Sequence, residues 1–87
     1  MPASTLQISK SVLKDLRALP RDLRGNVALS ILALAAEPRP HGTEKLSGYA
    51  GTYRLRVGDY RIVYEVGATS VTVLAVRHRR DVYRDLR

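Results

Sequence analysis

Arginine is concentrated in one short stretch of the chain, where its chemistry points to anion binding. The twelve residues 53–64, YRLRVGDYRIVY, include Arg54, Arg56 and Arg61. A guanidinium group is planar and permanently charged, and its N–H donors match the oxygens of a phosphate in pairs. We therefore take phosphate, and with it nucleic acid, as the leading ligand class for this stretch.

The same stretch has the pattern of a β-hairpin. Side chains alternate between the two faces of a strand, so Arg54 and Arg56 share one face and the apolar residues of 53–57 share the other. Gly58 suits the first central position of a two-residue type II′ turn, which would place Arg61 directly opposite Arg56. Like charges in that position destabilise a sheet by roughly 0.2 to 1 kcal/mol. A bound anion would offset the repulsion.

Two questions about this arginine face stay open in the sequence. The arginines could serve only to keep the outer face of a sheet solvated, with Glu65 balancing part of the charge. Arg77, on the next expected strand, would lie opposite Arg61 if the connecting loop has an odd number of residues. An even number would send Arg77 to the other face.

Charge and composition narrow the class of protein. The chain has 87 residues, of which 15 are basic and 8 acidic, for a net charge of +7. That charge favours nucleic acid as a partner, while an acidic protein or a membrane surface stays possible on charge alone. The absence of cysteine excludes disulfides and thiolate metal sites within this chain and favours a reducing, cytoplasmic setting. The longest apolar run, ILALAA at 31–36, is too short to span a membrane, so we expect a soluble cytoplasmic protein.

The remaining patterns predict an α+β fold, in which an N-terminal strand and a helical hairpin pack on one face of a mostly antiparallel sheet. We expect one domain over residues 1–87. The expected elements, in order, are a strand at 4–9, a helix from 10 to 19 capped by Ser9 or Ser11, a second helix from Pro20 or Arg21 to the start of 37–42, a loop at 38–48, strands near 51–57, 60–66 and 70–78, and a short helix or extended arm at 79–87.

Two segments of the sequence together resemble a known family. They are EKLSGYAGTYRLRVGDYRIVYEV at 44–66 and VTVLAVRHRRDVYRDL at 71–86. From Lys45 to Tyr83 they contain, in order, K-L-x-G, a basic–apolar–basic triplet, G-x-Y-R-[IV]-V-Y, and an arginine-rich end with D-V-Y. This series resembles the RelE toxins of bacterial and archaeal toxin–antitoxin pairs, within the RelE/ParE superfamily.

The resemblance implies a function and partners. RelE toxins are small, basic endoribonucleases that enter the ribosomal A site, cleave the mRNA codon and so inhibit translation, and a cognate antitoxin neutralises them. The implied partners are therefore an antitoxin protein, the ribosome and mRNA, with no membrane, no metal and no organic cofactor. The implied fold is RelE-like.

The resemblance also implies site residues. Its catalytic set is basic apart from one tyrosine: Arg54, Arg56, Arg61, Arg77 and Tyr83. Further residues expected to bind RNA are Lys45, His78, Arg79 and Arg80. Many family members have lysine where this chain has Arg54 and Arg56, and that departure puts a proton-accepting role of these positions in doubt, because arginine has a pKa above about 12.

The chemistry of the residues agrees with RNA cleavage except at proton transfer. Attack by the 2′-hydroxyl creates a dianionic phosphorane, which arginines fixed around one phosphate would stabilise. Tyr83 could stack on a base or orient the attacking hydroxyl. Histidine has an unperturbed pKa near neutrality, and the chain has His41 and His78. His78 is either catalytic or structural, since strand alternation points it away from Arg77, and His41 is expected to be a surface residue.

Two other functions fit the same scaffold. One is a ParE-like inhibitor of DNA gyrase without ribonuclease activity, and the other is a basic RNA-binding module without catalysis. ParE-type members usually lack the full arginine and tyrosine set. The presence of Arg61, Arg77 and Tyr83 therefore favours the ribonuclease.

Overall fold

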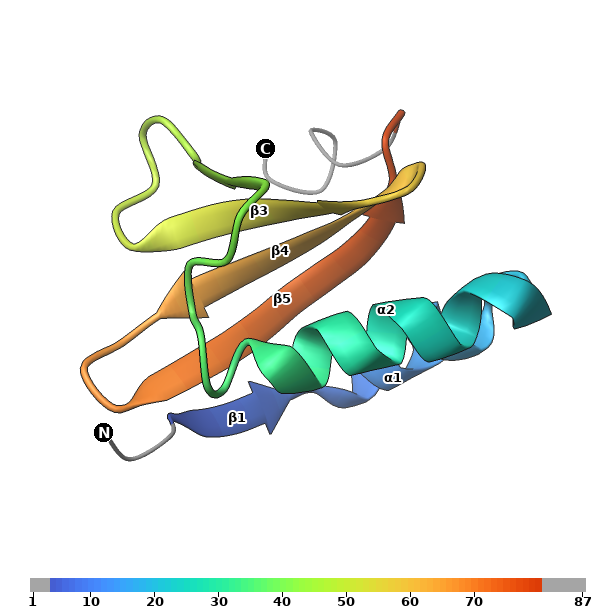
Figure 1. Cartoon of the computed structure of the whole chain (residues 1–87), viewed down its shortest axis with the longest axis horizontal. Coiled ribbons are helices and arrows are strands. Elements are labelled where there is room, and N and C mark those ends of the chain that lie inside the picture. Colours follow the sequence, from blue (N-terminus) through green and yellow to red (C-terminus); the bar gives the residue numbers. More distant parts are fainter. Residues whose placement is uncertain (1–3, 81–87) are drawn as a thin grey trace.

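The computed structural model describes residues 4–80, which form one five-stranded sheet with two helices on one face (Figure 1). The elements are β1 (Thr5–Ile8), α1 (Lys10–Arg17), α2 (Arg21–Ala33), β2 (Thr43–Lys45), β3 (Thr52–Val57), β4 (Tyr60–Val66) and β5 (Ser70–His78). The strand order is β1-β5-β4-β3-β2. Strand β1 pairs parallel with β5, and the other pairs are antiparallel. The predicted α+β fold with a mostly antiparallel sheet is confirmed.

Local hydrogen bonds set both ends of helix α1. Helix α1 begins where the Ser9 hydroxyl accepts a hydrogen bond from the amide of Val12 at 3.2 Å, so the first of the two expected caps is confirmed. The guanidinium of Arg24 donates to the carbonyls of Arg17 at 2.9 Å and Leu19 at 3.1 Å. These bonds satisfy carbonyls that the end of α1 leaves without partners, and they fix α2 against it.

The main core lies between the helices and the sheet. Its fully buried members come from both layers: Val12, Val27, Ile31, Leu34, Ile62, Tyr64, Val71 and Val73. Tyr64 is the largest of them, and its hydroxyl donates to the carbonyl of Pro38 at 2.7 Å. Burial raises the pKa of the Tyr64 phenol. This residue therefore ties the segment after α2 to the centre of the sheet.

The expectation of a loop at 38–48 was wrong in part. Residues Thr43–Lys45 form strand β2, which extends the sheet beyond β3 and places Glu44 opposite Arg54. A strand of three residues is too short to show alternation, and it has two prolines and a glycine before it and glycines after it. Its pairing with β3 satisfies backbone groups that would otherwise be left at the sheet edge.

The expected C-terminal helix or arm lies mostly outside the described residues, which end at Arg80. Within the described part, no helix has both the length and the apolar character that crossing a membrane requires. A small second cluster, made of Leu46, Val63 and Ala75, is buried on the sheet face opposite the helices. That outer face carries three of the predicted site residues, Arg54, Arg56 and Arg61.

Candidate functional site, an arginine-lined hollow

The predicted arginine hairpin is confirmed in its register. Arg56 pairs with Arg61, and Val57 pairs with Tyr60. Gly58 has φ +59°, and within residues 4–80 positive φ values occur only at glycine. A positive φ at the first central position alone corresponds to the type II′ turn. The two arginines are therefore brought face to face by the turn chemistry of the hairpin.

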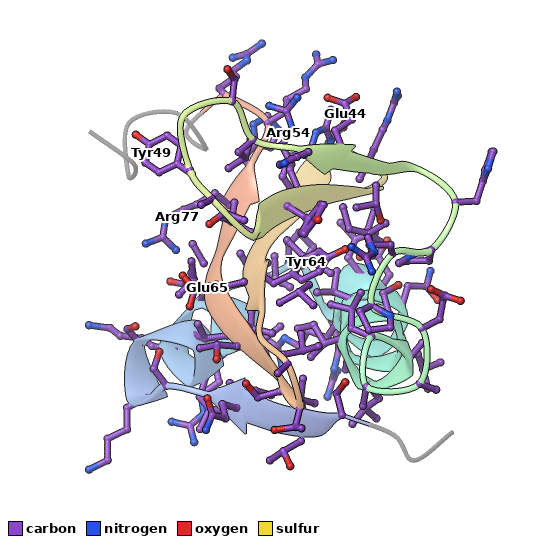
Figure 2. The ribbon with its side chains drawn as sticks, turned by 90° about the vertical axis from the view of Figure 1, so that its left-hand side faces the viewer. Glu44, Tyr49, Arg54, Tyr64, Glu65 and Arg77 are labelled. Carbon is purple, nitrogen blue, oxygen red and sulfur yellow. The ribbon has the colours of Figure 1, made fainter. Side chains whose placement is uncertain are left out.

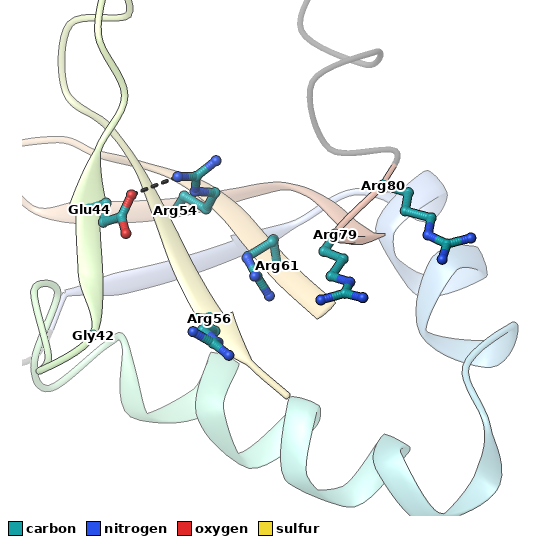
Figure 3. Close-up of a pocket in the computed structure, with 7 residues that line it drawn as sticks. All are labelled: Gly42, Glu44, Arg54, Arg56, Arg61, Arg79 and Arg80. Carbon is teal, nitrogen blue, oxygen red and sulfur yellow. Dashed lines mark hydrogen bonds and ion pairs between the residues drawn. The ribbon is translucent and has the colours of Figure 1, made fainter. Parts of the chain in front are cut away.

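A hollow of about 500 Å³ opens on this outer face (Figure 3). The residues that line it come from β2 and the segment before it, from β3 and β4, and from the chain just after β5: Gly42, Glu44, Arg54, Arg56, Arg61, Arg79 and Arg80. The amide of Arg79 donates to the carbonyl of Asp59 at 2.8 Å, which fixes the chain after β5 to the hairpin turn. Five arginines and one glutamate give the hollow a strong excess of positive charge.

The arginines of the hollow differ in how they are held. Nη2 of Arg54 donates to Oε2 of Glu44 at 2.6 Å (Figure 3). Nη1 of Arg61 donates to the carbonyls of Gly58 at 3.1 Å and Tyr60 at 3.0 Å, which orient the group without neutralising it. Among residues 4–80, no carboxylate lies within ion-pair distance of Arg61. Its charge is therefore available to an anion.

Arg77 lies opposite Arg61, but the loop is not what places it there. The register before the bulge, with Val66 opposite Val71, would put Val76 opposite Arg61 and turn Arg77 toward the helices. A bulge in the β4–β5 ladder adds one residue on β5 and shifts the pairing, so that Arg61 faces Arg77. The register that the sequence left open is therefore decided within the strand.

The side chain of Arg77 is nevertheless not part of the hollow. Its Nη1 bonds Oδ2 of Asp15 on α1, and the same oxygen accepts from the amide of Val76 at 3.4 Å. Strand β1 ends its pairing with β5 at Val73, so Asp15 supplies an acceptor at the edge that β1 leaves uncovered. Figure 2 shows Arg77 apart from Arg54 and Glu44.

The other predicted site residues fall into separate places. His78 stands edge-on to Tyr60, with ring centroids 5.5 Å apart, and lines a smaller hollow of about 300 Å³ that also includes Asp15 and Arg77. His78 therefore lies outside the arginine hollow, although it lines the smaller hollow together with Arg77, the residue from which alternation predicted that it points away. Lys45 lines a third hollow with residues 46–50. Tyr83 lies outside the described residues.

Two residues of the hollow were missed by sequence reasoning. Glu44 was not singled out because the strand that carries it was not predicted. Gly42, with φ +92°, lies one step beyond the last β2–β3 pair, on the side of Arg56, and contributes no side chain there. The sequence signal for these residues was their spacing from the strand that carries Arg54 and Arg56. That spacing indicates a shared site only when residues 43–45 are known to pair with that strand.

The hollow has the chemistry of an anion site. Several guanidinium groups on a rigid sheet can share the oxygens of one phosphate. Within the described part of the chain, no three histidine, aspartate or glutamate side chains gather in a way that would hold a metal ion. What the residues present can do is bind and polarise a phosphate.

Comparison with known proteins gives a consistent set of relatives. Residues 6–83 match the family model of the ParE toxin of the type II toxin–antitoxin system, parDE. Toxin RelG of Mycobacterium tuberculosis is 35% identical over 83 residues, which cover 92% of this chain and 95% of RelG. Toxin RelE3 of Methanocaldococcus jannaschii is 32% identical over 79 residues, covering 86% of this chain and 90% of RelE3.

A solved structure shares the fold. It is the archaeal RelE–RelB complex from Pyrococcus horikoshii OT3, whose matching chain is 30% identical to this one with a TM-score of 0.77. The match covers 88% of this chain and 96% of the other. The RelE-like fold implied by the resemblance is therefore confirmed.

Proposed function

The chain belongs to the ParE toxin family of type II toxin–antitoxin systems, within the RelE/ParE superfamily, and on this premise we propose that it is a ribosome-dependent endoribonuclease. It would cleave mRNA in the ribosomal A site and so inhibit translation. The observation that carries this proposal is the hollow in which five arginines surround a space large enough for a phosphate.

The geometry suits the charge that develops during RNA cleavage. When the 2′-hydroxyl attacks phosphorus, negative charge grows on the phosphoryl oxygens, and donors already in place stabilise it without reorganising. Arg61 is the central candidate, because carbonyl groups orient it and Arg56 stands opposite. By analogy with oxyanion-hole donors, each such group is worth about 10² to 10³ in rate.

The other predicted residues take different roles in this proposal. Arg54 contacts the phosphate from the side of Glu44, and Arg79 and Arg80 contact the RNA backbone on either side of the scissile bond. For Arg77 to reach the phosphate, its ion pair with Asp15 would have to open. Tyr83 remains a proposed stacking or orienting residue, and Lys45 and His78 remain proposed RNA contacts outside the hollow.

A protein antitoxin is the second proposed partner. The RelE of Pyrococcus horikoshii was solved as a complex with RelB, and this chain shares its fold. With a net charge of +7, this chain would be held inactive by an antitoxin that places an acidic or amphipathic segment on it. A short reading frame next to the gene would identify the candidate.

Controlled expression tests the nuclease directly. The chain is induced from a tightly repressed promoter, and mRNA 5′ ends are mapped with and without an inhibitor of translation. We expect new ends inside codons that disappear when translation is blocked. Intact mRNA after growth arrest would contradict the proposal.

Inhibition of DNA gyrase is a second candidate, because the matching family model is that of a ParE toxin. It predicts intact mRNA together with induction of the DNA-damage response. The same induction experiment therefore separates the two functions.

A further inference from the structure

We propose that Glu44 is the group that accepts the proton of the attacking 2′-hydroxyl. This assignment rests on the proposed ribonuclease function and deepens it. It concerns proton transfer, for which the arginines are chemically unsuited.

A proton acceptor must offer a lone pair at the reacting atom. Arginine stays protonated at all accessible pH values and has five donors but no acceptor. Of the residues that line the hollow, all except Gly42 and Glu44 are arginines. The carboxylate of Glu44 is therefore the one side-chain acceptor among the described residues that line this space.

The position of Glu44 fits that role. Its backbone pairs with Arg54, and its Oε2 is held by the Arg54 guanidinium at 2.6 Å. Its other oxygen, Oε1, accepts no hydrogen bond from residues 4–80. The side chain is 68% exposed, so an incoming hydroxyl can reach it. Figure 3 shows the carboxylate at the edge of the arginine group. One oxygen is thus fixed in place while the second remains open to the hollow.

The histidines lie elsewhere. His78 packs edge-on against Tyr60 and lines a different hollow, and His41 is exposed and is not among the residues of the arginine hollow. Glu65, also exposed on the outer face of β4, is likewise outside the hollow. Glu65 therefore serves as a matched control for the charge of Glu44.

The proposed step conserves atoms and protons. The 2′-oxygen forms a bond to phosphorus as its proton passes to Oε1 of Glu44. The bond between phosphorus and the 5′-oxygen breaks, and the 5′-oxygen keeps the electron pair and takes a proton from water. The hydroxide left by that water then removes the proton from Glu44. The products are a 2′,3′-cyclic phosphate and a 5′-hydroxyl, with the carboxylate regenerated.

Single-turnover cleavage on ribosomes programmed with a defined mRNA tests the assignment. Glu44→Gln keeps an oxygen that can accept from Arg54 but removes the proton acceptor. We expect its cleavage rate constant to fall by about 10² or more, the range of general-base contributions. Its affinity for the programmed ribosome should stay equal or increase, because a negative charge has left a cationic site. Glu65→Gln should cleave at the wild-type rate.

An unchanged cleavage rate in Glu44→Gln would overturn the assignment. If Glu44 only balances the charge of the arginines, Glu44→Gln would bind the ribosome as tightly or more tightly and cleave as fast as the wild type. That outcome leaves the ribonuclease function standing. A wild-type chain that does not cleave at all would instead overturn the proposed function, and the role of Glu44 with it.

Chemical rescue separates proton transfer from a structural role. Glu44→Ala should be as impaired as Glu44→Gln, and sodium formate should restore part of its cleavage rate, because formate supplies a carboxylate to the space left by the side chain. Sodium chloride at the same ionic strength is the control. Absence of any rescue, together with a loss of ribosome affinity in Glu44→Gln, would show that the residue positions Arg54 and does not accept the proton.

Discussion

Two arginine–carboxylate pairs among residues 4–80 have the same chemistry but differ in the exposure of their carboxylates. The pair between Arg77 and Asp15 joins β5 to α1, and its side chains are 30% and 19% exposed. The pair between Arg54 and Glu44 lies at the rim of the hollow, where the Arg54 side chain is 16% exposed but the Glu44 side chain is 68% exposed. The first pair closes a contact between layers, and the second holds a charged group at an open surface. The carboxylate partner therefore distinguishes Arg77, which joins β5 to α1, from Arg54, for which we propose a role in function.

The largest expected effect is a loss of cleavage activity when a residue of the hollow is removed. Arg61→Ala should reduce ribosome-dependent cleavage by about 10² to 10³, because it removes the central donor of the hollow. The free energy of unfolding should change little, since Arg61 donates to two exposed or partly buried carbonyls at the turn, those of Gly58 and Tyr60. Cleavage assays and urea unfolding on the same preparation measure both. Full activity in a folded Arg61→Ala would break the assignment of the hollow as the site.

The next largest effect is a loss of stability when the Arg77–Asp15 pair is broken. Asp15→Ala should lower the free energy of unfolding by about 1 to 3 kcal/mol, because it leaves the amide of Val76 and the guanidinium of Arg77 without this acceptor. Glu44→Ala is the matched control, and it should cost less than about 1 kcal/mol, as exposed pairs do. Equal losses in urea unfolding of the two variants would show that the pairs are equivalent.

Salt concentration should affect ribosome binding at the hollow more than it affects the stability to which the Arg77–Asp15 pair contributes. Binding to programmed ribosomes should weaken as salt rises, with a slope of log K against log salt of about −0.7 for each phosphate contacted. Three contacts predict a loss of roughly ten-fold or more between 50 and 200 mM salt. The free energy of unfolding should change far less, because the Arg77–Asp15 pair is partly shielded from solvent. Binding that does not respond to salt would indicate an apolar interface.

The smallest expected effect concerns a buried group that carries no charge. Because burial raises the pKa of Tyr64, its contribution to stability is complete below the unfolded-state pKa of 10.0 and is lost as pH rises through the higher folded-state value. Unfolding experiments above pH 10 should show a decline in stability that Tyr64→Phe reduces. An unchanged decline in Tyr64→Phe would assign it to other groups.

The sequence predicted those parts of the site that depend on local rules. Alternation and the Gly58 turn were sufficient to place Arg56 opposite Arg61. The presence of Asp15 beneath Arg77 depends on packing between elements 62 residues apart in the chain, which no local pattern encodes. Glu44 was missed for a related reason, since a strand of three residues is defined by its partner and not by its own composition.

The extra residue in β5 makes the face on which Arg77 lies independent of the length of the turn after β4. Before the extra residue, Val71 and Val73 point into the core, and after it Val76 does. The alternation of side chains along β5 therefore shifts by one residue, and apolar side chains still face the core on both sides of the shift. The length of the turn after β4 and the facing of Arg77 are thereby uncoupled. Removing one residue at Leu74 and adding one in the turn at 67–69 would preserve the arginine's facing while moving the irregularity out of the strand. The same cationic surface is therefore compatible with turns of different length after β4.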